Sequence, residues 1–260
     1  MRLLTACSSC LPGGFLRRAG GTTLRGALLP LAWLALLAAM PVAQAATPER
    51  MRLENVRLDA LAQDTQAVPD GAPQSHMALT WWVPYEYWSV AFLADKSLQP
   101  DAKAQVLGML KGFSLIAVVQ ADINELGMFT FYDQAEVASA MKVTLGGGTA
   151  ARELRPKGDV GPELTQLLGF LKPVLTAAIG NMGANMHFFV FDDVAAGGEG
   201  RVLDPYVAST LNVALRTKAG ADLLGTIETP LDALFVPRLC ANGKPAHVSW
   251  SYCPWDGKPL

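Results

Sequence analysis

The alternation of apolar and polar residues divides the chain into strand-like and helix-like runs. Residues 51–62 fit a helix and a strand equally well, so no element is assigned there. Residues 186–191 are apolar on both faces of a strand, which predicts a central position in a sheet. Strands are expected at residues 77–83, 113–119, 128–132, 186–191, 209–216 and 223–229.

Proline and capping residues mark the beginnings of the shorter helices. Pro84 and Pro100 suit a first helical turn, where the missing N–H of proline costs nothing, and Gly112 suits a left-handed helix stop. Asp133 stands three residues before Glu136, which is the spacing of a capping box. These signals predict helices over 85–93, from 100 to about 111, and from 133 to about 141.

The longest apolar stripe runs from Pro162 to Ile179 and predicts the strongest helix. Pro173 lies inside it, and its ring would press against the carbonyl of Gly169, so a kink is expected. Strands and helices do not alternate as they do in βαβ units. The pattern therefore predicts an α+β fold, with a mixed, largely antiparallel sheet packed against three to four helices.

The first 45 residues have the composition of an export signal. Four arginines and no acidic residue precede an apolar run over 27–40, and Ala43 and Ala45 place the cleavage site after Ala45. The run of about fourteen residues is shorter than the roughly 20 that a bilayer crossing requires. We expect a soluble periplasmic or secreted protein without a membrane span after cleavage; the general and twin-arginine routes both stay open.

Cleavage changes the charge balance of the chain. Removing four arginines from 21 basic residues leaves 17 against 23 acidic residues, a net charge of −6. This argues against nucleic acid and against an anionic lipid surface as partners, since both reward clustered lysine and arginine. Turn residues at 69–73 then suggest an N-terminal segment and linker (46–76), followed by an α+β domain (77–237) and a C-terminal lobe (238–260).

The C-terminal lobe repeats a short motif, because Gly-Lys-Pro follows both Cys240 and Cys253. Two such turns suggest a pair of facing knuckles with a strand over 248–252 between them. The repeat resembles the paired knuckles of a C-terminal zinc ribbon. The second cysteine of each knuckle is absent here, and only His247 and Asp256 could add ligands. A structural zinc site needs four donors, so no metal is expected.

Two cysteines remaining in an exported chain predict a disulfide between Cys240 and Cys253. The lobe is too small for a core of its own, so we expect Trp250, Tyr252 or Trp255 to pack on the main domain. Residues 81–88, 185–191 and 250–257 are also similar to segments of uncharacterised secreted bacterial proteins. That resemblance implies export and carries no activity.

An aromatic cluster around residues 81–92 provides the main candidate for binding. Trp81, Trp82, Tyr85 and Trp88 could pack in the core between a strand and the following helix, or line an apolar or carbohydrate-stacking groove. The groove interpretation predicts a non-enzymatic module of the cell envelope, without a cofactor, that binds a small apolar ligand or an envelope protein.

The alternative function is a carboxylate-dependent hydrolase. Its candidate residues are Glu86, Asp192 and Asp193, with His187 on the same strand as the two aspartates. Adjacent side chains on a strand point to opposite faces, so the two aspartates serve one site only if the strand bends. Because the sequence contains no nucleophile-elbow, Walker or zinc-protease motif, the enzyme class stays undetermined.

Overall fold

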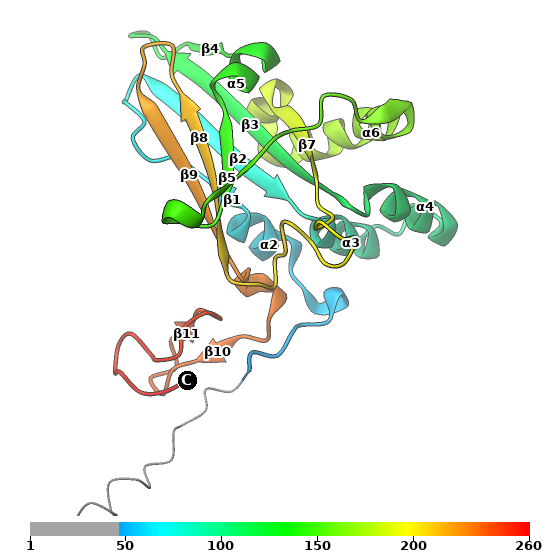
Figure 1. The fold of residues 1–260 in the computed structure, drawn as a ribbon, viewed down its shortest axis with the longest axis vertical. Coiled ribbons are helices and arrows are strands. Elements are labelled where there is room, and N and C mark those ends of the chain that lie inside the picture. The colour runs from blue at the N-terminus through cyan, green and yellow to red at the C-terminus, as the bar shows by residue number, and fades with distance from the viewer. Residues whose placement is uncertain (1–46) are drawn as a thin grey trace, which may run out of the picture. The chain divides into compact units, whose positions relative to one another are not determined.

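A computed structural model describes residues 47–260, except for the side chains of Thr149 and residues 174–181 (Figure 1). The export signal expected over residues 1–45 lies outside the described residues. The described chain contains helices and antiparallel sheets, which confirms the α+β class.

A five-stranded antiparallel sheet lies at the centre of the fold. Its strands are β1 (Gln66–Ala67), β2 (His76–Val83), β3 (Phe113–Ile123), β4 (Phe129–Phe131) and β7 (His187–Asp192). Strand β2 pairs along one side of β3. Strand β7 pairs with residues 113–118 of β3 on the other side, and β4 pairs with residues 121–123.

The prediction that the strand at 186–191 is central is wrong. Among the described strands, β7 pairs only with β3. Its alternating residues Phe189 and Val190 are nevertheless both buried, so both faces of the strand are covered. The apolar run therefore indicates that both faces of this strand are buried. It does not indicate that the strand has a neighbour on each side.

A second, four-stranded sheet packs against the first. It has the order β6–β5–β8–β9, from β5 (Lys142–Leu145), β6 (Arg152–Leu154), β8 (Ser209–Arg216) and β9 (Asp222–Thr229). Strands β8 and β9 were predicted, whereas β5 and β6 were not. The sheets approach closely at Gly225, where a Cβ atom would lie 2.7 Å from Thr80 Oγ1.

Helices α3, α4 and α6 lie on the side of the central sheet away from β8 and β9 (Figure 1). The described α-helices are α2 (Leu58–Asp64), α3 (Tyr85–Ala94), α4 (Pro100–Leu110), α5 (Gln134–Ala140) and α6 (Gly161–Ile179). The predicted starts and stops are confirmed: Gly112 has φ +92°, and Asp133 and Glu136 form both hydrogen bonds of a capping box. Helix α6 continues past Pro173, and the kink stays a prediction.

The N-terminal segment contributes to the same core. The undecided stretch forms a 3₁₀ turn (Leu53–Asn55) and α2, whose Leu61 is fully buried. The turn at 69–73 is held to β9, because the backbone N–H and C=O of Asp70 both bond to Leu224. Residues expected to form a linker therefore cover one part of the two-sheet core.

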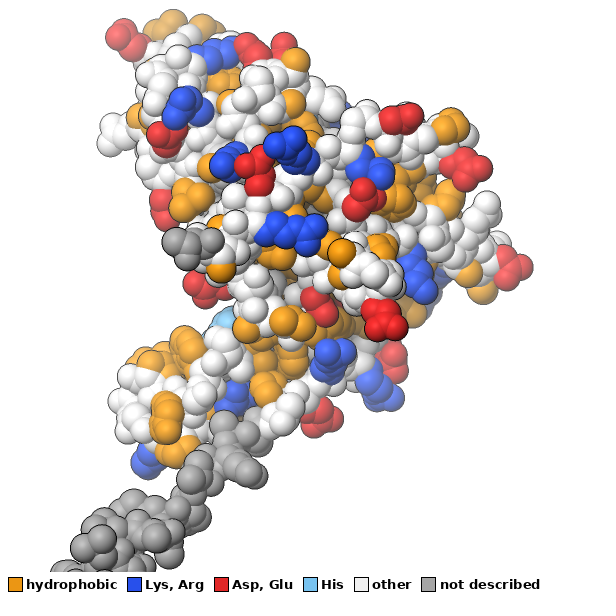
Figure 2. All heavy atoms as spheres, in the orientation of Figure 1, with side chains coloured by type: hydrophobic (Ala, Val, Ile, Leu, Met, Phe, Trp, Pro, Cys, Tyr) orange, Lys and Arg blue, Asp and Glu red, His pale blue; other side chains and the backbone are white. Residues whose placement is uncertain are grey.

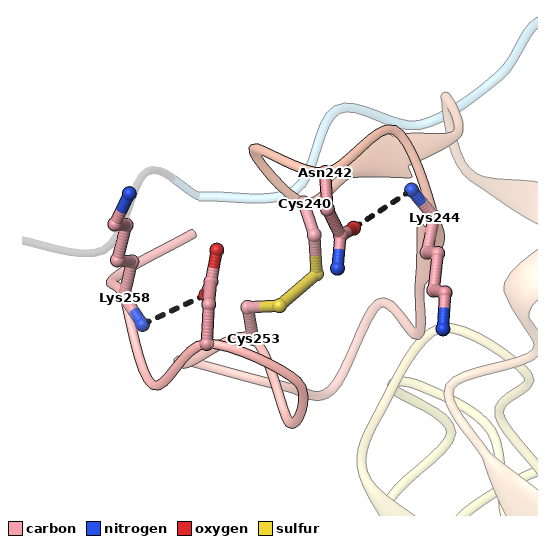
Figure 3. Close-up of a disulfide and its surroundings, with 6 residues drawn as sticks. Cys240, Asn242, Lys244, Cys253 and Lys258 are labelled. Carbon is pink, nitrogen blue, oxygen red and sulfur yellow. Dashed lines mark hydrogen bonds between the residues drawn. A yellow bond between two sulfur atoms is a disulfide. The ribbon is translucent and has the colours of Figure 1, made fainter.

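The C-terminal lobe contains the predicted disulfide, with Cys240 and Cys253 Cα atoms 5.7 Å apart (Figure 3). Two similar turns flank it: Asn242 Oδ1 accepts from the N–H of Lys244, and Asp256 Oδ1 accepts from that of Lys258. The short strands β10 (Arg238–Leu239) and β11 (Pro245–Ala246) pair within this lobe.

The prediction of a strand over 248–252 is wrong, because this stretch turns and anchors the lobe. The Trp250 N–H closes a turn on the carbonyl of His247. Val248 is buried in the main core, and its N–H donates to Asp232 Oδ1 at 2.8 Å. Val248 thus makes the anchoring contact expected of the lobe aromatics, and Trp250, Tyr252 and Trp255 are all exposed.

Candidate functional site

The predicted aromatic cluster divides between the two faces of β2. Trp81 faces α3, where its ring meets Tyr87 edge to face at 5.2 Å and its Nε1 donates to Thr65 Oγ1. Trp88 is also buried, whereas Tyr85 is half-buried. These contacts agree with core packing for Trp81 and Trp88. Trp82 is equally buried, at 1% exposed, but faces the second sheet.

A buried ion-pair network lies beside Trp82 and brings together two of the predicted acids. Glu86 is in the first turn of α3, and Asp193 directly follows β7. Arg201 joins them: its Nη1 lies 2.7 and 2.8 Å from the Glu86 carboxylate oxygens, and its Nε and Nη2 lie 2.9 and 2.7 Å from Asp193 Oδ2. Arg201 was not among the residues predicted from the sequence.

A tight return of the chain positions Arg201 next to Asp193. Val194 pairs with Arg201 in an antiparallel bridge, and the intervening residues include Gly197, Gly198 and Gly200, all with positive φ. Glycine accepts this left-handed backbone without the steric cost of a Cβ atom. The signal that could have located the site is therefore this glycine-rich turn, which ends in a single arginine.

Asp193 also accepts hydrogen bonds from two other groups. Ser114 Oγ donates to Asp193 Oδ2 at 3.0 Å, and the Leu203 N–H donates to Oδ1 at 2.6 Å. Trp82 Nε1 lies 3.3 Å from Ser114 Oγ and extends the chain of contacts to β2. The side chains of Asp193 and Glu86 are only 2% and 8% exposed, so both carboxylates are shielded from water, whereas the Arg201 side chain is 24% exposed.

Electrostatics keep the arginine of this network charged. Burial lowers the pKa of Arg201, but the charges and hydrogen bonds of Glu86 and Asp193 outweigh that effect and raise the pKa above its ordinary value. Burial also raises the pKa of Tyr206, with the charge of Glu86 as a further cause. The charged guanidinium of Arg201 therefore forms ion pairs with both carboxylates.

A cavity of about 320 Å³ lies next to this network, between the two sheets and the loop over residues 200–208. Its lining includes Trp82, Leu145, Arg201, Leu203, Leu211 and Thr229. Val207 also lines it and is 55% exposed, which places this residue at the mouth. Thr229 Oγ1 donates to the Val207 carbonyl at 2.6 Å, so this polar lining group already has a partner.

The other predicted catalytic residues lie elsewhere. Asp192 is exposed and pairs with Lys157 Nζ at 2.9 Å, on the opposite face from the buried Asp193. His187 is at the far end of β7, five residues from Asp192 and so roughly 16 Å away along the strand. Its Nε2 lies 2.8 Å from the Tyr132 carbonyl.

A second polar cluster contains the buried His76. Its Nδ1 lies 2.9 Å from Asp122 Oδ1, and Gln120 Nε2 lies 3.3 Å from its Nε2. Tyr132 Oη donates to the same Asp122 oxygen. Neither His76 nor His187 has a contact with Arg201, and no group of three potential metal ligands occurs among residues 47–260.

Comparison with protein-family models, with curated proteins and with solved structures produced no match. Within the described part of the chain, no helix combines the length and apolarity needed to cross a membrane.

Proposed function

We propose that this protein is an exported, non-enzymatic module that binds a small, largely apolar molecule in the cavity beside Trp82. The observation that supports this proposal is the cavity itself, which is lined by the buried Trp82 and Leu211 and by the exposed Val207. Its volume of about 320 Å³ is near the lower end of the roughly 300–1,000 Å³ typical of ligand pockets. That size suits a compact molecule with two or three rings or a short chain.

The composition of the cavity wall supports an apolar occupant. The aromatic and aliphatic side chains gain free energy when they exchange water for apolar ligand atoms. Arg201 and Asp204 are the charged residues in the lining, but Glu86 and Asp193 already engage the Arg201 guanidinium, and Asp204 Oδ1 accepts from the N–H of Tyr206. An anionic ligand would have to compete with Glu86 and Asp193 for Arg201.

The same contacts favour binding over hydrolysis. A general acid or base needs a free position within hydrogen-bonding reach of the substrate. Neither Glu86 nor Asp193 is among the residues that line the cavity, and Arg201 engages both carboxylates. In this proposal the ion pairs of Arg201 with Glu86 and Asp193 stabilise the cavity wall. The hydrolase alternative therefore has less support.

Two features support an exported setting. The arginine-rich and then apolar N-terminus has the pattern of a signal peptide. The disulfide between Cys240 and Cys253 is of the kind that persists in oxidising compartments.

A fluorescence titration with N-phenyl-1-naphthylamine, a neutral apolar dye, tests the proposal. The experiment uses the exported protein and two variants that place tryptophan at exposed valines. Val207→Trp narrows the cavity mouth, and Val68→Trp is the matched control, because Val68 is 76% exposed and does not line the cavity. We expect saturable binding by the parent and the control, and at least about tenfold weaker binding by Val207→Trp, a loss of about 1.4 kcal/mol. Absence of saturable binding, or equal affinity in all three proteins, would overturn the proposal.

A further inference from the structure

The C-terminal lobe exposes an aromatic surface that the proposed ligand cavity does not use. Trp255 and Tyr252 are 47% and 63% exposed, and the aliphatic Leu239 is 63% exposed. The Trp250 and Trp255 ring centroids lie 5.9 Å apart, so two large rings adjoin on this surface. Figure 2 shows hydrophobic side chains gathered on the lobe, with basic side chains between them.

Basic side chains accompany these aromatic residues. Lys244 Nζ lies 5.1 Å from the Trp255 ring centroid, and Lys258 is beside the backbone bridge between Tyr252 and Pro259. The two lysines extend on either side of the disulfide (Figure 3). Both are exposed, so their charges are available to a partner.

The charge of the lobe is opposite to that of the rest of the chain. Residues 238–260 contain three basic side chains and one acidic side chain, Asp256. Subtracting these from 17 and 23 leaves 14 basic and 22 acidic residues in positions 46–237. The lobe is therefore basic although the chain as a whole is acidic. Because electrostatic attraction to a surface acts only within about a Debye length, roughly 8–10 Å, the charge of the lobe itself decides its attraction to a surface.

We propose that this lobe docks on the surface of an anionic phospholipid bilayer. Tryptophan and tyrosine favour the headgroup region, because their rings are apolar and their N–H and O–H groups stay hydrated. Lysine near an anionic leaflet contributes about 1 kcal/mol per residue. Trp255, Tyr252 and Leu239 supply the apolar contact, and Lys244 and Lys258 supply the attraction.

Other occupants fit the lobe less well. A sugar ring stacks best on a flat aromatic platform, but the Trp250 and Trp255 ring planes are inclined at 70°. Leu239 adds aliphatic surface that a hydrated sugar polymer would not cover. A second copy of the lobe would bring two basic surfaces together, which like-charge repulsion opposes.

Anchoring through Val248 makes this surface a fixed part of the protein. Val248 is buried in the main core, and Arg238 Nη1 donates to the carbonyls of Val248 and Trp250. The disulfide joins the two turns that carry Lys244 and Lys258. The docking residues are thus presented by a covalently closed lobe.

Vesicle co-sedimentation tests the docking surface on the exported protein with its disulfide intact. We expect sedimentation with phosphatidylcholine vesicles that contain phosphatidylglycerol, and much less with phosphatidylcholine alone. Lys244→Gln and Lys258→Gln should each weaken binding about fivefold at low salt. Trp255→Ala should weaken it several-fold, and added salt should weaken binding of the parent.

Matched controls lie on the main domain. Phe129→Ala removes a ring that is 51% exposed on β4, and Lys111→Gln removes an exposed lysine. Both should bind as the parent does, and unchanged melting temperatures would show that the lobe variants remain folded. Quenching of tryptophan emission by brominated lipid should fall in Trp255→Phe. Equal binding to both vesicle types, unchanged binding by the lobe variants, or binding to insoluble peptidoglycan without vesicle binding would overturn the docking proposal.

Discussion

Arg201 Nη1 lies 2.7 and 2.8 Å from the two carboxylate oxygens of Glu86, although 115 residues separate them in the sequence. The contact ties the loop that borders the cavity to the first turn of α3. Asp193 engages the other edge of the same guanidinium. The ion-pair network therefore links the end of β7, helix α3 and the cavity wall.

Removing Arg201 should strongly destabilise the protein. Arg201→Met would leave two buried carboxylates without their cation, and breaking a buried ion pair in this way costs about 3–5 kcal/mol. Urea unfolding should show a loss of that size. Arg155→Met is the matched control: Arg155 is 86% exposed, lies 3.5 Å from Glu153, and should cost less than about 0.5 kcal/mol. Similar losses of unfolding free energy in Arg201→Met and Arg155→Met would contradict a stabilising role for the Arg201 ion pairs.

The close approach of the two sheets should make position 225 intolerant of a methyl group. Gly225→Ala would place Cβ 2.7 Å from Thr80 Oγ1, and relieving such overpacking costs about 1–3 kcal/mol. A second substitution, Thr80→Ala, should recover part of that loss in a double-mutant cycle.

Helix α4 provides the control for this glycine. Gly108→Ala meets no atom within 4 Å, and it should stabilise the protein by up to about 1 kcal/mol through helix propensity. Equal effects of the two glycine substitutions in thermal unfolding would show that the sheets do not pack as described.

The disulfide should stabilise the folded protein by restricting the unfolded chain. Its cysteines are 13 residues apart, and closing a loop of that length is worth roughly 3 kcal/mol in the chain-entropy account. Cys253→Ser should lower the melting temperature in oxidising buffer, and dithiothreitol should lower that of the parent to the same extent. Two reactive thiols in the oxidised, folded protein would refute the pairing.

Asp64 should make stability fall as the pH rises. Burial, followed by the charge of Asp232, raises the pKa of Asp64 in the folded protein above the ordinary value of 3.8. The folded state then binds more protons than the unfolded state between those two values, so the free energy of unfolding decreases as the pH increases through that window. Above the window the full penalty is present.

The variant Asp64→Asn should remove this penalty. Its amide oxygen can still accept from the Ala233 N–H, which lies 2.7 Å from Asp64 Oδ2. We expect the variant to be more stable than the parent at neutral pH and the difference to shrink below the ordinary aspartate pKa. A stability difference that does not change with pH in urea unfolding would show that Asp64 is not the cause.

Local signals in the sequence predicted most of the larger elements. Pro84, Pro100 and the Asp133–Glu136 pair act within one helical turn, so their effect is readable from adjacent residues. Strands β5 and β6 escaped prediction because each is only three or four residues long and they flank the glycine-rich loop. The strand expected over 248–252 failed because tertiary contacts of Val248 determine that backbone.

The candidate site was harder to predict, because its geometry depends on contacts between distant residues. Glu86 and Asp193 were named from the sequence, but nothing local indicated that one guanidinium would join them. Trp82 was named within an aromatic cluster whose members Trp81, Trp82 and Trp88 are all buried, and of these three only Trp82 lines the cavity. Strand alternation did correctly predict that Asp192 and Asp193 face opposite ways.

Native mass spectrometry of the freshly purified protein tests the central claim most directly. The account predicts a small-molecule adduct on the parent and on Val68→Trp, released on denaturation and lost or strongly reduced in Val207→Trp. A bare polypeptide mass for the parent, or the same adduct on Val207→Trp, would contradict a ligand in the cavity beside Trp82.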